Sequence, residues 1–197
     1  MLFLKLIMAF APWLAFLFIA HGTLLRLKLG LIIALALSVG MGIARLHRGV
    51  ILWVGLVFFT CATLAVVVFH NMWAVRYMGI MASGVLATGT WLTVIFGRPF
   101  TMDYAKEHTD PSLWESPSFI RTNMILTSAW GLAFTINALL AWGKMKHFIL
   151  PELGYELISY TLLIGTAAFT SWFPGYTRRR AGEITPHAPE TEVESVE

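Results

Sequence analysis

The sequence has little charge and almost no cysteine. Asp, Glu, Lys and Arg make up 13% of its 197 residues, whereas about 25% is usual in a soluble domain. The single cysteine, Cys61, excludes a disulfide or a cysteine-based metal site within one chain. Hydrophobic residues reach 57% and gather in long runs. Because only a bilayer accommodates several such runs, the composition predicts a membrane protein.

Sequence motifs of catalysis and cofactor binding are also missing. The chain has no GxSxG elbow, no Walker phosphate loop and no paired-carboxylate motif of membrane transferases. Its six histidines fall between the apolar runs or at their ends, so we expect neither haem nor zinc. The net charge of +3 comes from scattered basic residues without a basic stripe, and we expect no nucleic-acid partner. We therefore predict a protein that is not an enzyme and needs no cofactor.

Six apolar runs are long enough, or nearly so, to cross a bilayer as helices. The predicted fold is all-α, a polytopic transmembrane bundle within residues 1–175. We interpret the first run as a retained helix, since no convincing cleavage site follows it. The expected spans are residues 3–20, 27–44, 50–69, 77–96, 124–142 and 155–173.

The basic residues outside these spans predict the orientation of the chain. In a six-span arrangement Lys and Arg are more frequent on the side of both termini, which places both termini in the cytoplasm. Residues 176–197 carry three arginines and then an acidic run with prolines. A segment with so little to bury is expected to be a disordered tail.

Small residues form rows on the second and fourth expected spans. Helices in lipid associate where small side chains let backbones approach closely. The rows indicate packing within one bundle, and homo-oligomerisation through span 2 or span 4 is the alternative. They are Ala34, Ser38 and Gly42, with Ala36, Gly40 and Ala44 beside them, and Gly79, Ser83 and Ala87, with Gly84 and Thr88 beside them.

Asn137 lies deep in the fifth expected span, where a polar side chain is costly unless it has a partner. It must bind another helix through hydrogen bonds or line a polar cavity, and the sequence leaves both open. With Thr88, Thr90 and Thr135 it could line a polar path through a small transporter or channel.

Glu156 stands near the start of the sixth expected span, with Glu152 one turn before it. Both carboxylates should lie at the membrane interface. Lys144 and Lys146, just before that span, are placed to offset their charge.

The connection 97–123 is too long and too featured for a simple turn. Gly97 can relax a helix end, Arg98 can reach lipid phosphates, and Pro99 prevents the helix from continuing. Asp110 and Ser116 each precede a proline, which is typical of a capped helix start. We expect two short helices or turns, the second running into the fifth span.

Aromatic and apolar side chains in this connection suggest contact with the membrane surface, and capping of the bundle is the alternative. These side chains are Phe100, Tyr104, Leu113, Trp114 and Phe119.

Several short motifs follow one another in an order that resembles a known family. Phe69-His70 ends the third span, Arg76 follows, and Gly97-Arg98-Pro99 comes later. The stretch "FIRTN" then supplies Arg121 and Asn123, followed by Trp130 and Asn137. In this arrangement the chain resembles the intracellular septation protein A (YciB) family of bacterial inner-membrane proteins.

This resemblance implies a multi-pass protein of the bacterial inner membrane that supports envelope biogenesis or septation. It implies contacts with lipids and with other envelope or division proteins rather than catalysis. A membrane anchor subunit of a larger complex is a further alternative. The candidate interaction or structural residues are His70, Arg76, Gly97, Arg98, Pro99, Trp114, Arg121, Asn123, Trp130, Asn137 and Glu156.

Overall fold

A computed structural model describes residues 8–44, 49–146 and 151–184, and the regular structure within these ranges is helical. Between the long helices α5 and α7 lie three short ones: α6 (Thr101–Ala105), and the 3-10 helices η2 (Lys106–His108) and η3 (Pro111–Leu113). A π-helix, η1 (Leu64–Val68), continues α4. The longer helices are α2 (Ala11–Ile19), α3 (Leu24–Ile43), α4 (Val50–Thr63), α5 (Met72–Ile95), α7 (Pro117–Met145) and α8 (Glu152–Ile184).

Five segments in the described ranges are long and apolar enough to cross a membrane: Leu24–Ile43, Val50–Val68, Met72–Ile95, Pro117–Met145 and Glu152–Thr177. They confirm the prediction of a helical, multi-pass chain and account for the second to sixth expected spans. The first expected span, 3–20, starts in residues outside the described ranges. Its described part forms α2, whose 9 residues are fewer than the roughly 20 that a bilayer requires. A sixth span therefore stays a prediction.

Local capping explains where the long helices begin. Asn71 starts α5 before the expected residue 77, because its side chain accepts hydrogen bonds from the amides of Trp73 and Ala74 (2.9 and 3.2 Å). Ser116 caps α7 as predicted, accepting from the Phe119 amide, and the helix runs unbroken into the fifth span.

Helix α8 corrects the predicted start of the tail. It continues through Pro174 to Ile184, inside the segment 176–197 that we expected to be disordered. The arginines and alanine after residue 177 are good helix formers, so nothing in them ends the helix. Residues 185–197 lie outside the described ranges.

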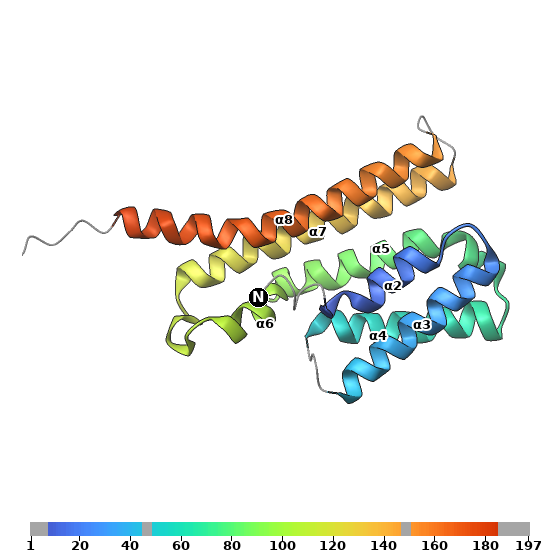
Figure 1. The fold of residues 1–197 in the computed structure, drawn as a ribbon, viewed down its shortest axis with the longest axis horizontal. Helices are drawn as coiled ribbons and strands as arrows, with labels where there is room; N and C mark the ends of the chain where they lie inside the picture. The colour runs from blue at the N-terminus through green and yellow to red at the C-terminus, as the bar shows by residue number, and fades with distance from the viewer. Residues whose placement is uncertain (1–7, 45–48, 147–150, 185–197) are drawn as a thin grey trace, which may run out of the picture.

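Helix α5 lies between the α2–α3–α4 group and the α7–α8 pair (Figure 1). The chain passes back and forth, so each end of the bundle collects particular segments. One end of the bundle, which we call the α6 end, holds the starts of α2, α4 and α7 and the end of α5 (Figure 1). The opposite end holds Gly22, His70 and the start of α8. Which end faces the cytoplasm stays a prediction.

Aromatic side chains fill the centre of the bundle. Phe10 stacks on Trp130, with ring centroids 5.2 Å apart and planes at 16°, and both contact Phe134. Trp13 packs in the same way on Phe58. On the outside, large apolar side chains are exposed, as expected for surfaces that face lipid.

Only some residues of the small-residue rows pack against other helices of the chain. Ala34 and Ser38 of α3 are buried inside the chain, whereas a Cβ added at Gly40 or Gly42 would meet no atom within 4 Å. In α5, Gly79 faces Ala141 of α7. Part of each row thus packs within the bundle, and oligomerisation through the remainder stays a prediction.

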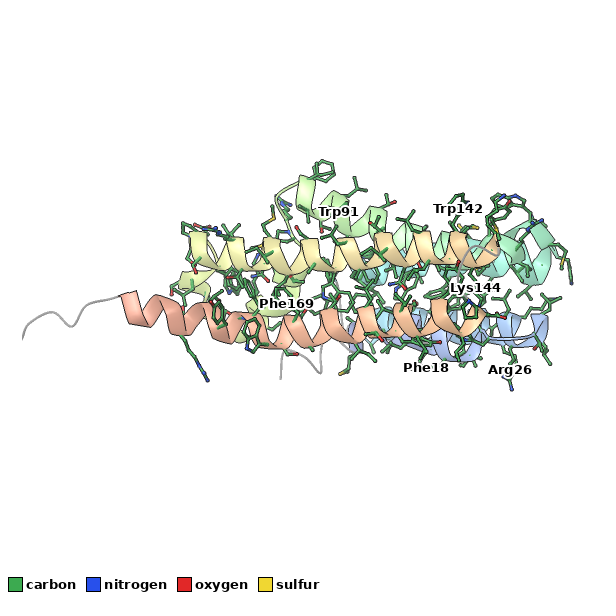
Figure 2. All side chains as sticks on the ribbon, turned by 90° about the horizontal axis from the view of Figure 1, so that it is seen from above. Phe18, Arg26, Trp91, Trp142, Lys144 and Phe169 are labelled. Atoms are coloured by element: carbon green, nitrogen blue, oxygen red, sulfur yellow. The ribbon has the colours of Figure 1, made fainter. Side chains whose placement is uncertain are left out.

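Helices α5 and α7 are in close contact where the side chain of Trp91, labelled in Figure 2, lies across Gly131. A Cβ at Gly131 would stand 2.9 Å from the indole ring. The same indole donates its Nε1 proton to Thr135 Oγ1, one turn further along α7, at 3.1 Å. The glycine is therefore required by the position of the ring.

We expect Gly131→Ala to lower the free energy of unfolding by about 1–3 kcal/mol, because the added methyl overpacks the Trp91 contact. Thermal unfolding in detergent, followed by tryptophan fluorescence, measures the change. Gly165→Ala in α8 is the matched control, since no atom lies within 4 Å of its added Cβ. Equal stability of the two variants would contradict the role of Gly131.

Candidate functional site

The residues singled out from the sequence divide between the two ends of the bundle. Trp130 lies between them, in the aromatic core. His70, Arg76, Asn137 and Glu156 belong to the half nearer the start of α8. The α6 end collects Gly97, Arg98, Pro99, Trp114, Arg121 and Asn123.

At the α6 end, residues 97–101 turn sharply out of α5 and back into the bundle. Gly97 has a φ of 68°, a left-handed conformation that glycine adopts without strain. The exposed Arg98 donates its backbone amide to the Thr93 carbonyl at 2.9 Å. Pro99 and Phe100 are then fully buried. Only the first part of this turn is therefore free to meet a lipid or a partner.

Thr101 fixes the turn to α7. Its hydroxyl donates to the Asn123 carbonyl at 3.0 Å and lies 2.9 Å from Thr127 Oγ1. All three residues are buried. The Asn123 side chain bonds within its own helix, to the Phe119 carbonyl. The sequence did not single out Thr101 or Thr127, although Thr127 stands one turn after Asn123 and so shares its helix face.

Helix α6 joins this turn to α4. The Asp103 carboxylate lies near the backbone amide of Val50, the first residue of α4. Burial raises the pKa of the Asp103 carboxyl, while Lys106 and the Val50 amide act in the opposite direction. A carboxylate at a helix N-terminus is favoured by the helix dipole, so Asp103 helps to order the start of α4.

The predicted membrane-facing surface of this connection is wrong for two of its aromatic residues. Phe100 and Tyr104 are 1% and 3% exposed, because both pack into the bundle core. Burial, with the charges of Asp103 and Glu107, raises the pKa of the Tyr104 hydroxyl.

Trp114 and Asp110 hold the second half of the connection in shape. The Trp114 indole donates to the Thr109 carbonyl at 3.0 Å, and Lys106 Nζ lies 5.3 Å from its ring centroid. Asp110 caps η3 as predicted, accepting from the Ser112 amide and hydroxyl, which lowers the pKa of its carboxyl. Trp114 thus has a structural role within the loop, and its contact with a partner or lipid stays a prediction.

At the opposite end, His70 and Arg76 are exposed and do not form a site together. His70 has a φ of 51°, and its Nδ1 lies 3.0 Å from the Val68 carbonyl, at the turn between η1 and α5. Arg76 lies on the first turns of α5.

A cavity of about 150 Å³ with both apolar and polar lining residues lies between α2, α5, α7 and α8 towards this end. It contains Asn137 and Glu156 of the predicted residues. Its walls are formed by Leu17, His21, Gly79, Ser83, Asn137, Leu140, Ala141, Lys144, Tyr155, Glu156, Ser159 and Tyr160.

Asn137 both binds a neighbouring helix and lines this cavity. Its amide donates to the Ala133 carbonyl at 2.9 Å, and its oxygen accepts from the Ser159 hydroxyl of α8. Close by, the Tyr160 hydroxyl and His21 Nε2 are 3.1 Å apart, which joins α8 to the end of α2. The sequence did not single out His21, Ser159 or Tyr160 as site residues.

Lys144, labelled in Figure 2, lines the cavity and makes two ion pairs. Its Nζ lies 2.8 Å from Glu152 Oε1 and 2.8 Å from Glu156 Oε1. Of the two lysines expected to offset these carboxylates, Lys144 is the one that makes both ion pairs. Glu156 is the more buried partner, with 30% of its side chain exposed against 76% for Glu152.

Comparison with known proteins identified no matching family model, no matching curated protein and no matching solved structure. The resemblance to the septation protein family therefore stays a prediction. Within residues 8–44, 49–146 and 151–184, no three His, Cys, Asp or Glu side chains gather closely enough to hold a metal ion.

We expect Thr101→Val to lower the free energy of unfolding by about 0.5–1.5 kcal/mol, because it removes the buried hydroxyl that donates to the Asn123 carbonyl and lies against Thr127 Oγ1. Thr88→Val is the matched control. The Thr88 hydroxyl is exposed and bonds only one turn back in its own helix, to Gly84, so that change should stay within about 0.5 kcal/mol. Both are measured by thermal unfolding in detergent. Similar values for the two variants would show that Thr101 does not hold the turn.

Proposed function

We propose that this chain is a non-enzymatic, multi-pass protein of the bacterial inner membrane that supports envelope biogenesis or septation. It acts by holding partner proteins or lipids at its α6 end. The order of the connection 97–123 is the observation that carries this proposal. A loop that served only to join α5 and α7 would not need Phe100 buried against Phe10 and Thr101 buried against Thr127.

Those anchors leave basic side chains in fixed places at the surface. Arg98 is exposed beside the buried Pro99, and Arg121 is exposed on the first turns of α7, near the anchored Asn123. Because the backbone beneath them is held by Thr93 and Thr127, the arginines need little further ordering to bind. Anionic lipid headgroups or acidic segments of another membrane protein are the chemistry that fits them.

The test is affinity purification from native nanodiscs, with mass spectrometry of the proteins and lipids that co-purify. We expect Arg98→Ala with Arg121→Ala to reduce specific partners or anionic lipids about fivefold or more, since each basic residue near an anionic surface contributes about 1 kcal/mol. Arg26→Ala with Arg76→Ala, at exposed sites of the opposite end, is the matched control. Unchanged recovery in the first variant would rule out the α6 end as the contact.

Trp114 is tested separately, because its indole also orders the loop. Loss of partners in Trp114→Ala counts for a contact only if limited proteolysis shows the loop intact. Loss together with new cleavage in residues 97–123 assigns Trp114 to loop order.

A second candidate function, a small transporter or channel, is favoured by the cavity that the polar side chain of Asn137 lines. In proteoliposomes on a solid-supported membrane, a transporter should give currents after a concentration jump of its ion. Asn137→Leu, which fills the cavity with an apolar side chain, should abolish them. Leu139→Met on the exposed face of α7 is the control. No current across a panel of small ions would remove this candidate for charged solutes.

A further inference from the structure

The cavity at Asn137 combines an apolar wall with a few polar groups. A cavity of about 150 Å³ is large enough for a molecule of benzene, or about six non-hydrogen atoms. Leu17, Leu140 and Ala141 form the apolar wall. A ligand of this size would therefore place an apolar part against these side chains and a polar part against the rest of the lining.

The lining of the cavity carries no net charge when His21 is neutral. Lys144 and Glu156 pair with each other, with 2.8 Å between Nζ and Oε1. Glu152, the second partner of Lys144, lies outside the lining and is 76% exposed, so water screens its charge. A charged ligand would leave water without meeting an unpaired charge of opposite sign, and such a transfer is costly. An uncharged ligand avoids this cost.

Two uncharged polar side chains, Ser83 of α5 and Asn137 of α7, line the cavity at the same level. The level follows from a nearby contact, since a Cβ added at Gly79 would lie 3.4 Å from the Ala141 Cβ. Ser83 stands four residues after Gly79, and Asn137 stands four residues before Ala141. Because α5 and α7 run in opposite directions, these two steps bring Ser83 and Asn137 to one height in the bundle.

Both side chains have hydrogen-bonding groups left for a ligand. Among the described residues, the Ser83 hydroxyl has no hydrogen-bond partner. The Asn137 amide donates one of its two N–H groups to the Ala133 carbonyl, and the second has no assigned partner within the same ranges. An amide or hydroxyl head matches this pair, because it accepts from Asn137 and donates to Ser83. An ammonium group lacks the acceptor, and a carboxylate lacks the donor.

We propose that this cavity binds a small uncharged molecule with an amide or hydroxyl head and a short apolar part. The head lies between Ser83 and Asn137, and the apolar part lies against Leu17 and Leu140. Cations and anions of the same size bind more weakly. The proposal concerns binding alone, so it depends neither on the contacts proposed for the α6 end nor on transport.

The test is isothermal titration calorimetry on the full-length protein in detergent, with three probes of the same chain length: butyramide, butylammonium and butyrate. Protein-free detergent is the blank. We expect butyramide to bind at least fivefold more tightly than either ion, and butanol to displace it. Equal or tighter binding of either ion, or the lack of saturable butyramide binding, would overturn the proposal. These comparisons use the natural chain and do not depend on the folding of any variant.

A pair of matched serine variants then locates the site. Ser83→Ala removes a hydroxyl that lines the cavity and has no partner among the described residues. We expect it to weaken butyramide binding about threefold to tenfold, the loss of one neutral hydrogen bond. Ser171→Ala is the control, because that exposed hydroxyl bonds only to the Ala167 carbonyl of its own helix. Its affinity should stay within about twofold of the natural chain.

Thermal unfolding in detergent checks that both serine variants fold. A folded Ser83→Ala variant that binds butyramide as tightly as Ser171→Ala would show that the ligand does not occupy this cavity.

Discussion

The contact between α5 and α7 is the constraint on which the rest of the bundle depends. One face of α7 carries Asn123, Thr127, Trp130, Phe134 and Asn137 at alternating spacings of four and three residues, the period of a helix seam. These side chains are all buried. The turn after α5 binds the first two, Phe10 of α2 stacks on Trp130, and α8 binds Asn137. The turn after α5, the start of α2 and helix α8 are therefore positioned by this one face.

Polar groups in the membrane must form hydrogen bonds inside the protein. Most hydroxyls here form them within their own helix. Thr60, Thr135, Thr166 and Ser171 each donate to the carbonyl four residues earlier in their own helix. Such side chains indicate little about function. The groups that bond between helices are fewer. The indoles of Trp91 and Trp130 donate to Thr135 and Thr170, and the other such bonds lie at Thr101 and around Asn137. At the two candidate sites the bonding groups come from several segments, which distinguishes these sites from the other polar positions of the spans.

The sequence predicted the long helices well because length, apolar content and capping residues act locally. Ser116 and Asp110 cap helices as expected, and Asn137 has the partner that its depth required. The pairs Thr101–Thr127 and His21–Tyr160 could not be predicted. They join segments far apart in the chain, and helices that are apolar on all sides give no periodic signal of which face is buried. We predicted too early a start for the disordered tail. The acidic, proline-containing end of the chain indicated disorder, and we extended that prediction to the helix-forming residues before it.

The two candidate sites are separated by the aromatic layer of α7. Trp130 and Phe134 lie along the helix between Thr127 and Asn137, Phe10 packs against both, and Phe100 packs against Phe10. A ligand in the cavity would thus face a barrier towards the α6 end. Each aromatic pair contributes only about 0.5–1.5 kcal/mol beyond its buried area, but moving Phe10 would also disturb its contact with Phe100, beside the buried Thr101. A movement of Phe10 at the cavity side would therefore also disturb the packing of the turn that places Arg98 at the surface.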